Sequence, residues 1–563
     1  MYMLGSFRSA LRPSQWLVLG LMLFSLLASA HISRVVLERL PRLEDEYAYL
    51  YQAKIFARFQ AYVVREEAVK VFWQPFVLQP ESTDSYDGVA RRFGKYTPGY
   101  PLVLSVGVML GQPWLINAVF GMLNVGLIYR LGKLVFAHTT QGEAIGVIAA
   151  ALLAISPTAL ILNATLMSHT WALFAAMLFV YAYLKSIRML TEIRPARRWA
   201  ILCGVMLGAL FITRPLTAVM IGTPVALHAL TLYLRSDKAR LALARLLVTA
   251  SIAALPVMSL WGLFNFIWTG NPLTNTYTLQ WPYDKVGFGE GSGLNPGGHS
   301  FYWAWRNARA DLTFWMRDTF GFTLSQETAD YLKTHWGYQA GVGLAWLFVL
   351  MGLLYGRKMP QVWWMFSFFV AIVVGGLFYW IGSAVHGGAV YSVRYYYEAI
   401  FGACLVAAYG FVALAGDLGK HGPKIVYIGL ALACIASVVG YTPARLREPL
   451  PGEWVNGLYG FNRTSQAQLA KIEAMRQQYA TAPHQKVLLV ILRPQTGDPD
   501  NWRDYGAALA QTSPFLDSDI VVARVFDPKE SPEIERRFLD RLVLYQSGAQ
   551  LYPTLEDALH SSK

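Results

Sequence analysis

Long apolar stretches, separated by short polar segments, follow one another from the beginning of the chain to about residue 441. Each is roughly 16 to 22 residues long, and a helix that rises about 1.5 Å per residue needs about 20 apolar residues to cross a bilayer. The pattern therefore predicts a polytopic α-helical membrane protein with about eleven transmembrane helices. The predicted spans are residues 14–32, 114–136, 143–161, 170–188, 199–213, 215–234, 246–267, 341–356, 361–381, 399–416 and 424–441.

Two apolar stretches differ from an ordinary span. Residues 101–110, "PLVLSVGVML", are too few to cross a bilayer, so we expect a half-helix that lies in the membrane interface or dips into it. The first stretch ends in small residues, "LLASAHIS", as a signal peptide does, but it is long enough to span. We therefore expect it to stay as the first transmembrane helix, with cleavage as the alternative.

The composition agrees with a membrane protein and excludes a soluble one of this size. Of 563 residues, 55% are hydrophobic and only 15% are charged, and the mean hydropathy is +0.35. The formal charge of +13 does not indicate a nucleic-acid partner, because basic residues collect in the cytoplasmic loops of polytopic proteins. The three cysteines all lie in apolar segments, so no disulfide framework is expected.

Basic residues gather in alternate connections between the predicted spans. By the positive-inside rule these connections face the cytoplasm of a cell whose plasma (inner) membrane holds the protein. They are residues 185–198, 235–245 and 356–358, with Lys420 and Lys424. The long connections 33–113 and 268–340, and everything after residue 442, then face the periplasm or the extracellular space.

The chain changes character after residue 442, where the charge density rises and no further span is predicted. "KVLLVIL" and "DIVVARVF" have the pattern of two short buried strands. "DNWRDYGAALAQ" and "SPEIERRFLDRLVLY" have helical periodicity, and the second begins with the Ser-Pro-Glu of a helix N-terminus. We therefore predict a membrane domain, residues 1–442, followed by a soluble extracytoplasmic α/β domain, residues 443–563.

Three consecutive carboxylates open a helical segment in the first outer connection. In "LEDEYAYLYQAKIF", residues 43–56, Glu44, Asp45 and Glu46 precede apolar positions at helical spacing. Acidic residues at a helix start can simply cap free N–H groups and interact with the helix dipole. The alternative is acid–base chemistry at the outer face of the membrane.

Three outer segments also carry cations that can bind a lipid phosphate. "RRFGKYTPGYPL" supplies Arg92 and Lys95, "FITRPLTAV" supplies Arg214, and "VHGGAVYSVRYYYEAIF" supplies Arg394. The same cations could instead serve three ordinary purposes. These are attraction to anionic headgroups, snorkelling of Arg214 to the interface, and pairing of Arg394 with Glu398 four residues later.

Two histidines complete the candidate residues. His169, in "NATLMSHTW", lies at an outer helix mouth and is a candidate metal ligand together with Asp45, a candidate phosphate ligand, or merely hydrogen-bonded. His299 lies in the glycine-rich segment "GFGEGSGLNPGGHSFYW", which we expect to form a mobile flap over a site. With Tyr395 and Glu398, His299 is assigned to the flap or to acceptor contacts.

These motifs resemble a known family. An Asp-Glu pair just after the first span, followed by "GKYTPGYPL", resembles the GT-C glycosyltransferases of the protein O-mannosyltransferase and lipid A aminoarabinose transferase type. "SPTALILNATLMSHT", "ITRP", "DKVGFGEG" and "YSVRYYYEA" look like further motifs of such proteins. The resemblance covers residues 14–441, extends loosely to the C-terminal region, and implies a GT-C fold.

In that family the donor is a sugar on a polyprenyl phosphate and the acceptor is a lipid, a glycan or a protein. The resemblance implies that Asp45 acts as the base and that Glu46 supports it, in an inverting single displacement. The four cations would neutralise the departing phosphate. The second outer connection offers Asn163 and His169 where a second catalytic carboxylate is expected. No obligatory cofactor is therefore predicted, and a divalent cation is left open.

Two functions from other classes compete with this hypothesis. A transporter or flippase for a lipid-linked or polar solute would place charged residues along a path through the membrane, often in duplicated halves. In this chain the ionisable residues gather at the outer face, and no internal repeat is found. A non-catalytic membrane scaffold would need neither Asp45 nor the cations.

Overall fold

The structure is a computed structural model of the whole chain. It describes residues 12–65, 70–80, 87–190, 193–235, 237–323, 343–387, 389–447, 458–459, 465–493 and 501–560.

The membrane part is a bundle of apolar helices, which confirms the polytopic prediction. Within the described residues, eight helices are long and apolar enough to cross a membrane. These spans contain α1 (Pro13–Val35), α4 (Ile116–Val135), α7 (His169–Arg188), α8 (Ile193–Thr213), α9 (Pro215–Arg235), α10 (Asp237–Thr269), α17 (Ile400–Asp417) and α18 (Gly422–Ala436).

The other three predicted spans are shorter or broken. The span predicted at 143–161 bends by 61° between α5 (Gly142–Ile155) and α6 (Pro157–Asn163), because Pro157 has no amide hydrogen with which to continue the helix. The last two correspond to α14 (Ala345–Tyr355) and α15 (Pro360–Gly376), of 11 and 17 residues. Among the described residues, fewer helices are thus long enough to span than the eleven that the sequence predicted.

The outer connections form small elements at one end of the bundle. The first contains α2 (Glu44–Phe56), a sheet with strands in the order β1-β3-β2, and α3 (Gly99–Met109). The half-helix predicted at 101–110 is thus present as α3. The remaining elements here are β1 (Val63–Val64), β2 (Val77–Leu78), β3 (Arg91–Gly94), α11 (Thr276–Gln280), α12 (Phe301–Asp318), α16 (Ser383–Gly387) and the 3₁₀ helix η3 (Arg394–Ala399).

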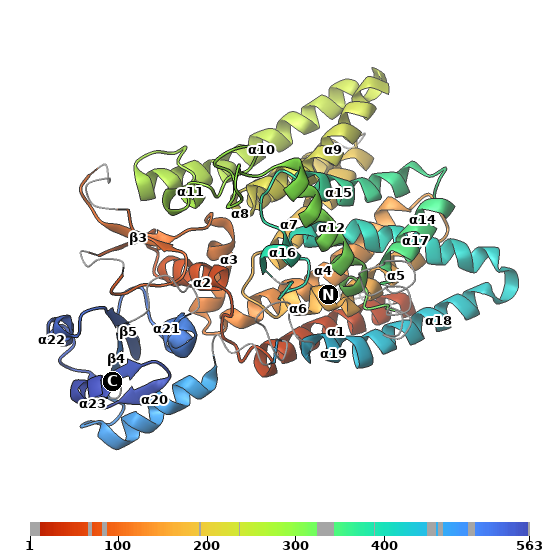
Figure 1. The fold of residues 1–563 in the computed structure, drawn as a ribbon. Coiled ribbons are helices and arrows are strands. Elements are labelled where there is room, and N and C mark those ends of the chain that lie inside the picture. The colour runs from red at the N-terminus through yellow and green to blue at the C-terminus, as the bar shows by residue number, and fades with distance from the viewer. Residues whose placement is uncertain are drawn as a thin grey trace, which may run out of the picture.

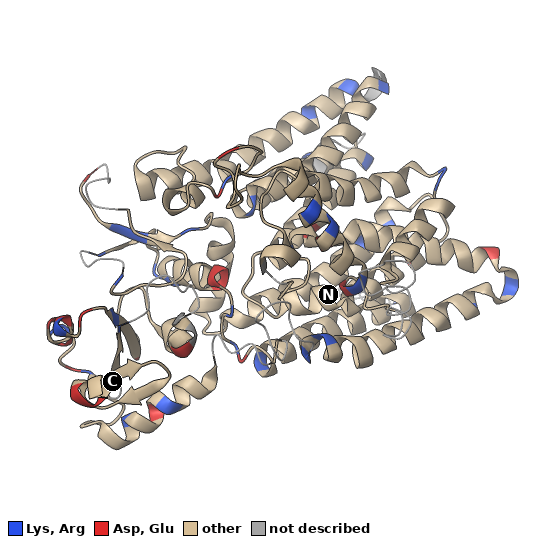
Figure 2. Cartoon of the chain, viewed as in Figure 1, with Lys and Arg blue, Asp and Glu red and all other residues tan. Residues whose placement is uncertain are grey.

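Charge is distributed unevenly along the bundle. Figure 2 shows basic residues at the turns between α9 and α10 and between α17 and α18, at the end away from the C-terminal sheet. Figure 1 shows α2, α3 and β3 at the other end, between the bundle and that sheet. This is the asymmetry on which the predicted topology rests.

The C-terminal region folds around a four-stranded sheet with strands in the order β5-β4-β6-β7. β4 (Val487–Leu492) pairs in parallel with β5 (Ile520–Val525) and with β6 (Leu542–Ser547), and β7 (Gln550–Tyr552) is antiparallel to β6. The two predicted strands are present. Helices around the sheet are α20 (Gln466–Tyr479), α21 (Gly506–Gln511), α22 (Ser531–Glu535) and α23 (Leu555–His560).

One local prediction in this region is wrong. The periodicity of residues 531–545 predicts a single helix, but α22 ends at Glu535 and the following "LVLYQS" is strand β6. The apolar residues of this strand pack with those of β4, its parallel neighbour, in the sheet. Tertiary pairing therefore outweighs the helical spacing of the sequence.

Helix α2 connects this sheet to the membrane bundle. Leu40 and Tyr47 belong to the same hydrophobic cluster as Val487 and Val522 of the sheet. The hydroxyl of Tyr47 donates to the carbonyl of Gly506 at 2.9 Å. The helix that begins with the three carboxylates is thus packed on one side by the C-terminal region.

Candidate functional site

Asp45 meets a cation from a distant loop. It is the second residue of α2, and its carboxylate Oδ2 lies 3.7 Å from Nη2 of Arg394, the first residue of η3. The two side chains are 20% and 12% exposed, so the pair is neither sealed nor fully hydrated. A partly accessible carboxylate beside a guanidinium can receive a proton from a bound hydroxyl.

Tyr96 holds the other carboxylate oxygen. Its hydroxyl donates to Oδ1 of Asp45, and its ring stacks on Tyr49 with centroids 4.5 Å apart. Burial and the charge of Asp45 raise the pKa of Tyr96 well above its ordinary value, so the phenol stays protonated and remains a donor. Asp45 is therefore oriented before any substrate binds.

Glu46 has a different role from its neighbour. Its carboxylate is buried and accepts hydrogen bonds from the amides of Arg42, Leu43 and Leu166 and from the hydroxyl of Tyr391, at 2.8 to 3.1 Å. Burial raises the pKa of Glu46, and the four donors oppose that rise. These bonds fix the start of α2 against two other outer segments.

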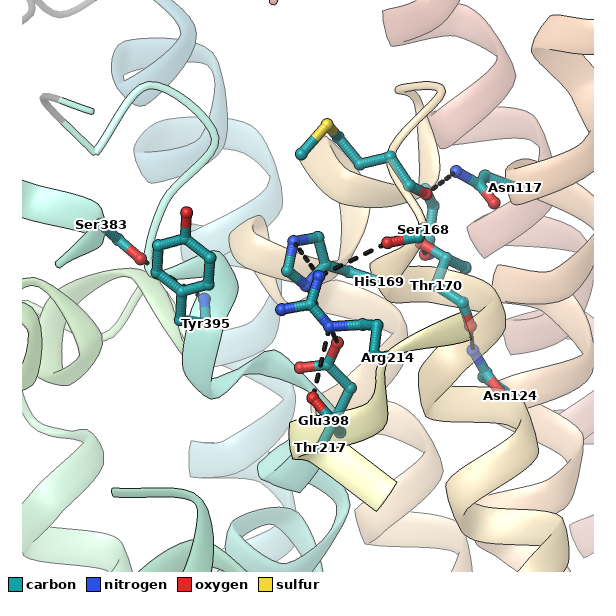
Figure 3. A network of polar contacts seen from close by, with 12 residues as sticks. Asn117, Asn124, Ser168, His169, Thr170, Arg214, Thr217, Ser383, Tyr395 and Glu398 are labelled. Carbon is teal, nitrogen blue, oxygen red and sulfur yellow. Dashed lines mark hydrogen bonds and ion pairs between the residues drawn. The ribbon is translucent and has the colours of Figure 1, made fainter. Parts of the chain in front are cut away.

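Arg214 is the centre of the second charged group (Figure 3). Its Nε lies 3.0 Å from Oε1 of Glu398, and its Nη1 lies 3.5 Å from Oγ of Ser168 and from Nε2 of His169. His169 Nδ1 is 3.0 Å from the same Glu398 oxygen. These residues come from three separate segments of the chain: the N-terminal end of α7, the break between α8 and α9, and η3.

Tyr395 joins the two groups into one site. The guanidinium carbon of Arg394 lies 5.2 Å from the centroid of its ring, and that of Arg214 lies 5.9 Å from it. Two of the three arginines that the sequence analysis assigned to phosphate binding are therefore close to one aromatic ring, and one of them, Arg394, also contacts Asp45. The side chain of Arg214 is 20% exposed.

Lys95 is near this site, but its charge is already paired with that of Asp284. Its Nζ lies 2.6 Å from Oδ2 of Asp284, within an aromatic box formed by Phe76, Tyr96, Tyr277 and Trp281. Asp284 also accepts from the Tyr379 hydroxyl and the Trp380 indole. This ion pair ties the first outer connection to the later outer connection that contains Asp284.

Arg92 and His299 are held by structural contacts. Arg92 is buried and donates to the side chain of Gln79 at 2.7 Å and to the carbonyl of Phe72 at 3.2 Å. His299 is buried, its Nε2 lies 2.9 Å from the carbonyl of Leu377, and its ring stacks on Phe288. Arg92 is thus fixed within its own outer segment, and His299 is fixed between its own segment and the end of α15 (Pro360–Gly376).

A metal site has no support from the geometry of the described residues. Nowhere among them do three or more His, Cys, Asp or Glu side chains stand in an arrangement that could hold a metal ion. The two ring nitrogens of His169 face Glu398 and Arg214.

Some residues of the site were not assigned from the sequence. Tyr96 follows Lys95 directly in "GKYTPGYPL", and Asp284 opens "DKVGFGEG", so both lie in motifs that pointed to the family. Ser168 likewise lies in the motif "SPTALILNATLMSHT", whereas Tyr49, whose hydroxyl is 3.0 Å from that of Ser168, gave no signal of its own. A tyrosine or serine in an apolar sequence reveals its partner only when the chain is folded.

Comparisons with known proteins identify the fold. No family model matches this sequence, and no curated protein matches it. The structure of ArnT from Cupriavidus metallidurans in the apo state superimposes with a TM-score of 0.52 at 13% identity, over 87% of this chain and 84% of that one. The structure of the same ArnT bound to undecaprenyl phosphate gives 0.51 at 14% identity, over 96% and 98%. The chain thus has the GT-C fold that its motifs predicted.

Proposed function

We propose that the protein transfers a sugar from a polyprenyl-phosphate donor to an acceptor at the outer face of the membrane. The observation that carries this proposal is the contact of 3.7 Å between Asp45 and Arg394, beside Arg214, on the fold of ArnT. One ArnT structure contains undecaprenyl phosphate. A base next to phosphate-binding cations is what transfer from such a lipid requires.

In the proposed reaction Asp45 removes the proton from the acceptor hydroxyl. The acceptor oxygen attacks the anomeric carbon from the face opposite the phosphate. The bond between that carbon and the phosphate oxygen breaks, and its electron pair stays on the polyprenyl phosphate. The configuration at the anomeric carbon is inverted, and the donated hydrogen bond from Tyr96 keeps Asp45 oriented throughout.

Arg394 and Arg214 are the proposed phosphate ligands. Negative charge grows on the leaving phosphate oxygen in the transition state, and guanidinium groups already in place stabilise it without reorganisation. Lys95 is proposed to hold the outer loops together, because Asp284 already neutralises it. Arg92 and His299 are not assigned to the donor site, since Arg92 donates to Gln79 and Phe72 and Nε2 of His299 lies against the carbonyl of Leu377.

The C-terminal α/β region is proposed to lie in the periplasm or extracellular space and to support α2. Tyr47 and Lys54 of α2 both donate to carbonyls of the α21 segment, at 2.9 and 2.7 Å. This region therefore packs against the helix that carries Asp45 and hydrogen-bonds to it. We also propose that the same region recognises the acceptor.

Release of undecaprenyl phosphate from undecaprenyl-phosphate sugars tests the reaction. The purified protein is incubated with a panel of such donors and a lipid or glycan extract, and the released lipid is measured by mass spectrometry. We expect release by the wild type and a loss of about a hundredfold or more in Asp45→Asn. The control is Glu143→Gln, whose carboxylate contacts Arg12 and Ser14 at the opposite end of the bundle.

Full release by Asp45→Asn would remove the proposed base. A wild type that moves the lipid across vesicle membranes but releases no undecaprenyl phosphate would instead favour the transporter or flippase alternative.

A further inference from the structure

Glu398 is a buried carboxylate that the proposed reaction does not use. We propose that Glu398 and His169 are positioning residues, which orient Arg214 so that its outer N–H groups face the phosphate of the donor lipid. This inference rests on the proposed function. It adds an explanation of how the site gains affinity for the phosphate, because Arg214 is held in the orientation that binds it.

The first step is the placement of the carboxylate. Glu398 is completely buried, and its Oε1 lies 3.0 Å from both Nε of Arg214 and Nδ1 of His169. Its Oε2 makes no hydrogen bond within the described part of the chain. A buried carboxylate with one unsatisfied oxygen is costly, and a side chain with a purely structural role would be expected to avoid that cost.

The second step is the tautomer of His169. Because Nδ1 faces a carboxylate oxygen, it carries the proton, and Nε2 then presents a lone pair. Nε2 lies 3.5 Å from Nη1 of Arg214, so the ring accepts there rather than donates. Ser168, fixed by the hydroxyl of Tyr49, lies at the same distance from Nη1. These two acceptors, Nε2 of His169 and Oγ of Ser168, therefore orient the Nη1 edge of the guanidinium.

The third step concerns the N–H groups of the Arg214 guanidinium that remain available to a ligand. Nε is used by Glu398 and by Thr217, and Nη1 has only the two long contacts. For Nη2, the described residues provide no hydrogen-bond partner, and Figure 3 shows this nitrogen on the side toward Tyr395. A planar fork held at Nε leaves its outer edge available to two phosphate oxygens.

The local backbone explains why Glu398 serves Arg214 and not its neighbour in sequence. Arg394 and Glu398 lie in the 3₁₀ helix η3, which has about three residues per turn, so positions four apart do not face each other. Arg394 turns to Asp45, and Glu398 turns to Arg214. One arginine is anchored by the proposed base and the other by a carboxylate sealed from solvent.

Equilibrium binding of undecaprenyl phosphate in detergent micelles tests this inference. We expect Glu398→Gln to bind this lipid about tenfold more weakly than the wild type, because the amide no longer holds Arg214 by charge. We expect His169→Asn, which keeps a donor to Glu398 but loses the Nε2 contact, to bind about threefold more weakly. Glu143→Gln serves as the matched control and should bind as the wild type does.

A double-mutant cycle separates positioning from general damage to the fold. In an Arg214→Ala background, Glu398→Gln should cause no further loss of affinity, because the group that it positions is absent. Glu398→Asp keeps the charge but withdraws the carboxylate by one methylene, so it should also bind weakly. Gel filtration and thermal unfolding establish that each variant is folded.

The outcomes distinguish this inference from the proposed function. Binding by Glu398→Gln or Glu398→Asp that equals or exceeds wild-type binding overturns the positioning role alone, as does an undiminished effect of Glu398→Gln in the Arg214→Ala background. A wild type that does not bind undecaprenyl phosphate overturns the proposed function, and the inference falls with it.

Discussion

The guanidinium of Arg394 lies 3.7 Å from the carboxylate of Asp45, and Glu398, four residues after Arg394, pairs with Arg214 instead. The contact brings the head of α2 and the start of η3 to one place. It also keeps two acids separate: Asp45 is partly exposed, whereas Glu398 is sealed. This difference in accessibility is why Asp45 is the proposed base.

Replacing the carboxylate by an amide is expected to lower the stability of the protein at Glu46 but not at Asp45. Glu46→Gln places an NH₂ group against donors, since all four partners of the carboxylate donate to it. We expect a loss of about 2 to 4 kcal/mol of stability, seen as a lower unfolding temperature in detergent. Asp45→Asn should unfold close to the wild-type temperature. Equal unfolding temperatures for wild type and Glu46→Gln would contradict the structural role of Glu46.

Tyr96→Phe removes the hydroxyl that orients Asp45. We expect transfer to slow by about three- to tenfold while the affinity for undecaprenyl phosphate stays unchanged, because the phenol contacts the base and not the proposed phosphate ligands. Steady-state release of the lipid measures this effect. Tyr302→Phe, at an exposed tyrosine of α12, is the control. A rate for Tyr96→Phe equal to that of the control would show that the hydrogen bond is unimportant.

The pair formed by Lys95 and Asp284 is expected to behave as a clasp between two outer loops. Asp284→Asn leaves the ammonium of Lys95 buried in its aromatic box without a counter-charge, and should cost about 3 to 5 kcal/mol. The double variant Lys95→Met with Asp284→Asn should recover part of that loss, because no charge is left unpaired. Thermal unfolding of the single and double variants measures this, and a double variant less stable than Asp284→Asn would contradict the clasp.

Lys54 gives the contact between α2 and the C-terminal region a pH dependence. Its amine donates to the carbonyls of Ala510 and Thr512, and burial lowers the pKa of Lys54 from 10.5 to about 8. Between these values the folded state binds fewer protons than the unfolded state, so stability rises with pH in that window. The cost of burying the charge is fully present below pH 8 and disappears above 10.5.

The difference in unfolding temperature between the wild type and Lys54→Met should therefore shift in favour of the wild type as pH rises from about 8 to 10. Lys471→Met, at an exposed lysine of α20, should show a difference that does not change with pH. A pH-independent difference for Lys54→Met would mean that the buried amine keeps its ordinary titration.

The sequence by itself determined the class of protein, most of the spans, the two helices of the first outer connection and two strands of the C-terminal sheet. These features depend on the length and spacing of apolar runs, which are local properties of the chain. The acids and arginines of the site were also visible, because charged residues beside apolar segments are rare and costly. The sequence indicated more candidate acids and cations than the proposed site uses.

Only the tertiary structure decided which of these residues act together. The sequence could not separate Asp45 from Glu46, because the difference lies in donors from residues 166 and 391 that surround Glu46. It did not tell that Arg92 is buried within its own loop or that Asp284 neutralises Lys95. Strand β6 likewise depends on its pairing with β4. The contacts of Glu46 and Lys95 and the pairing of β6 join positions far apart in the chain, and Arg92 contacts residues 13 and 20 positions away within its own loop. Local periodicity predicts neither kind of contact.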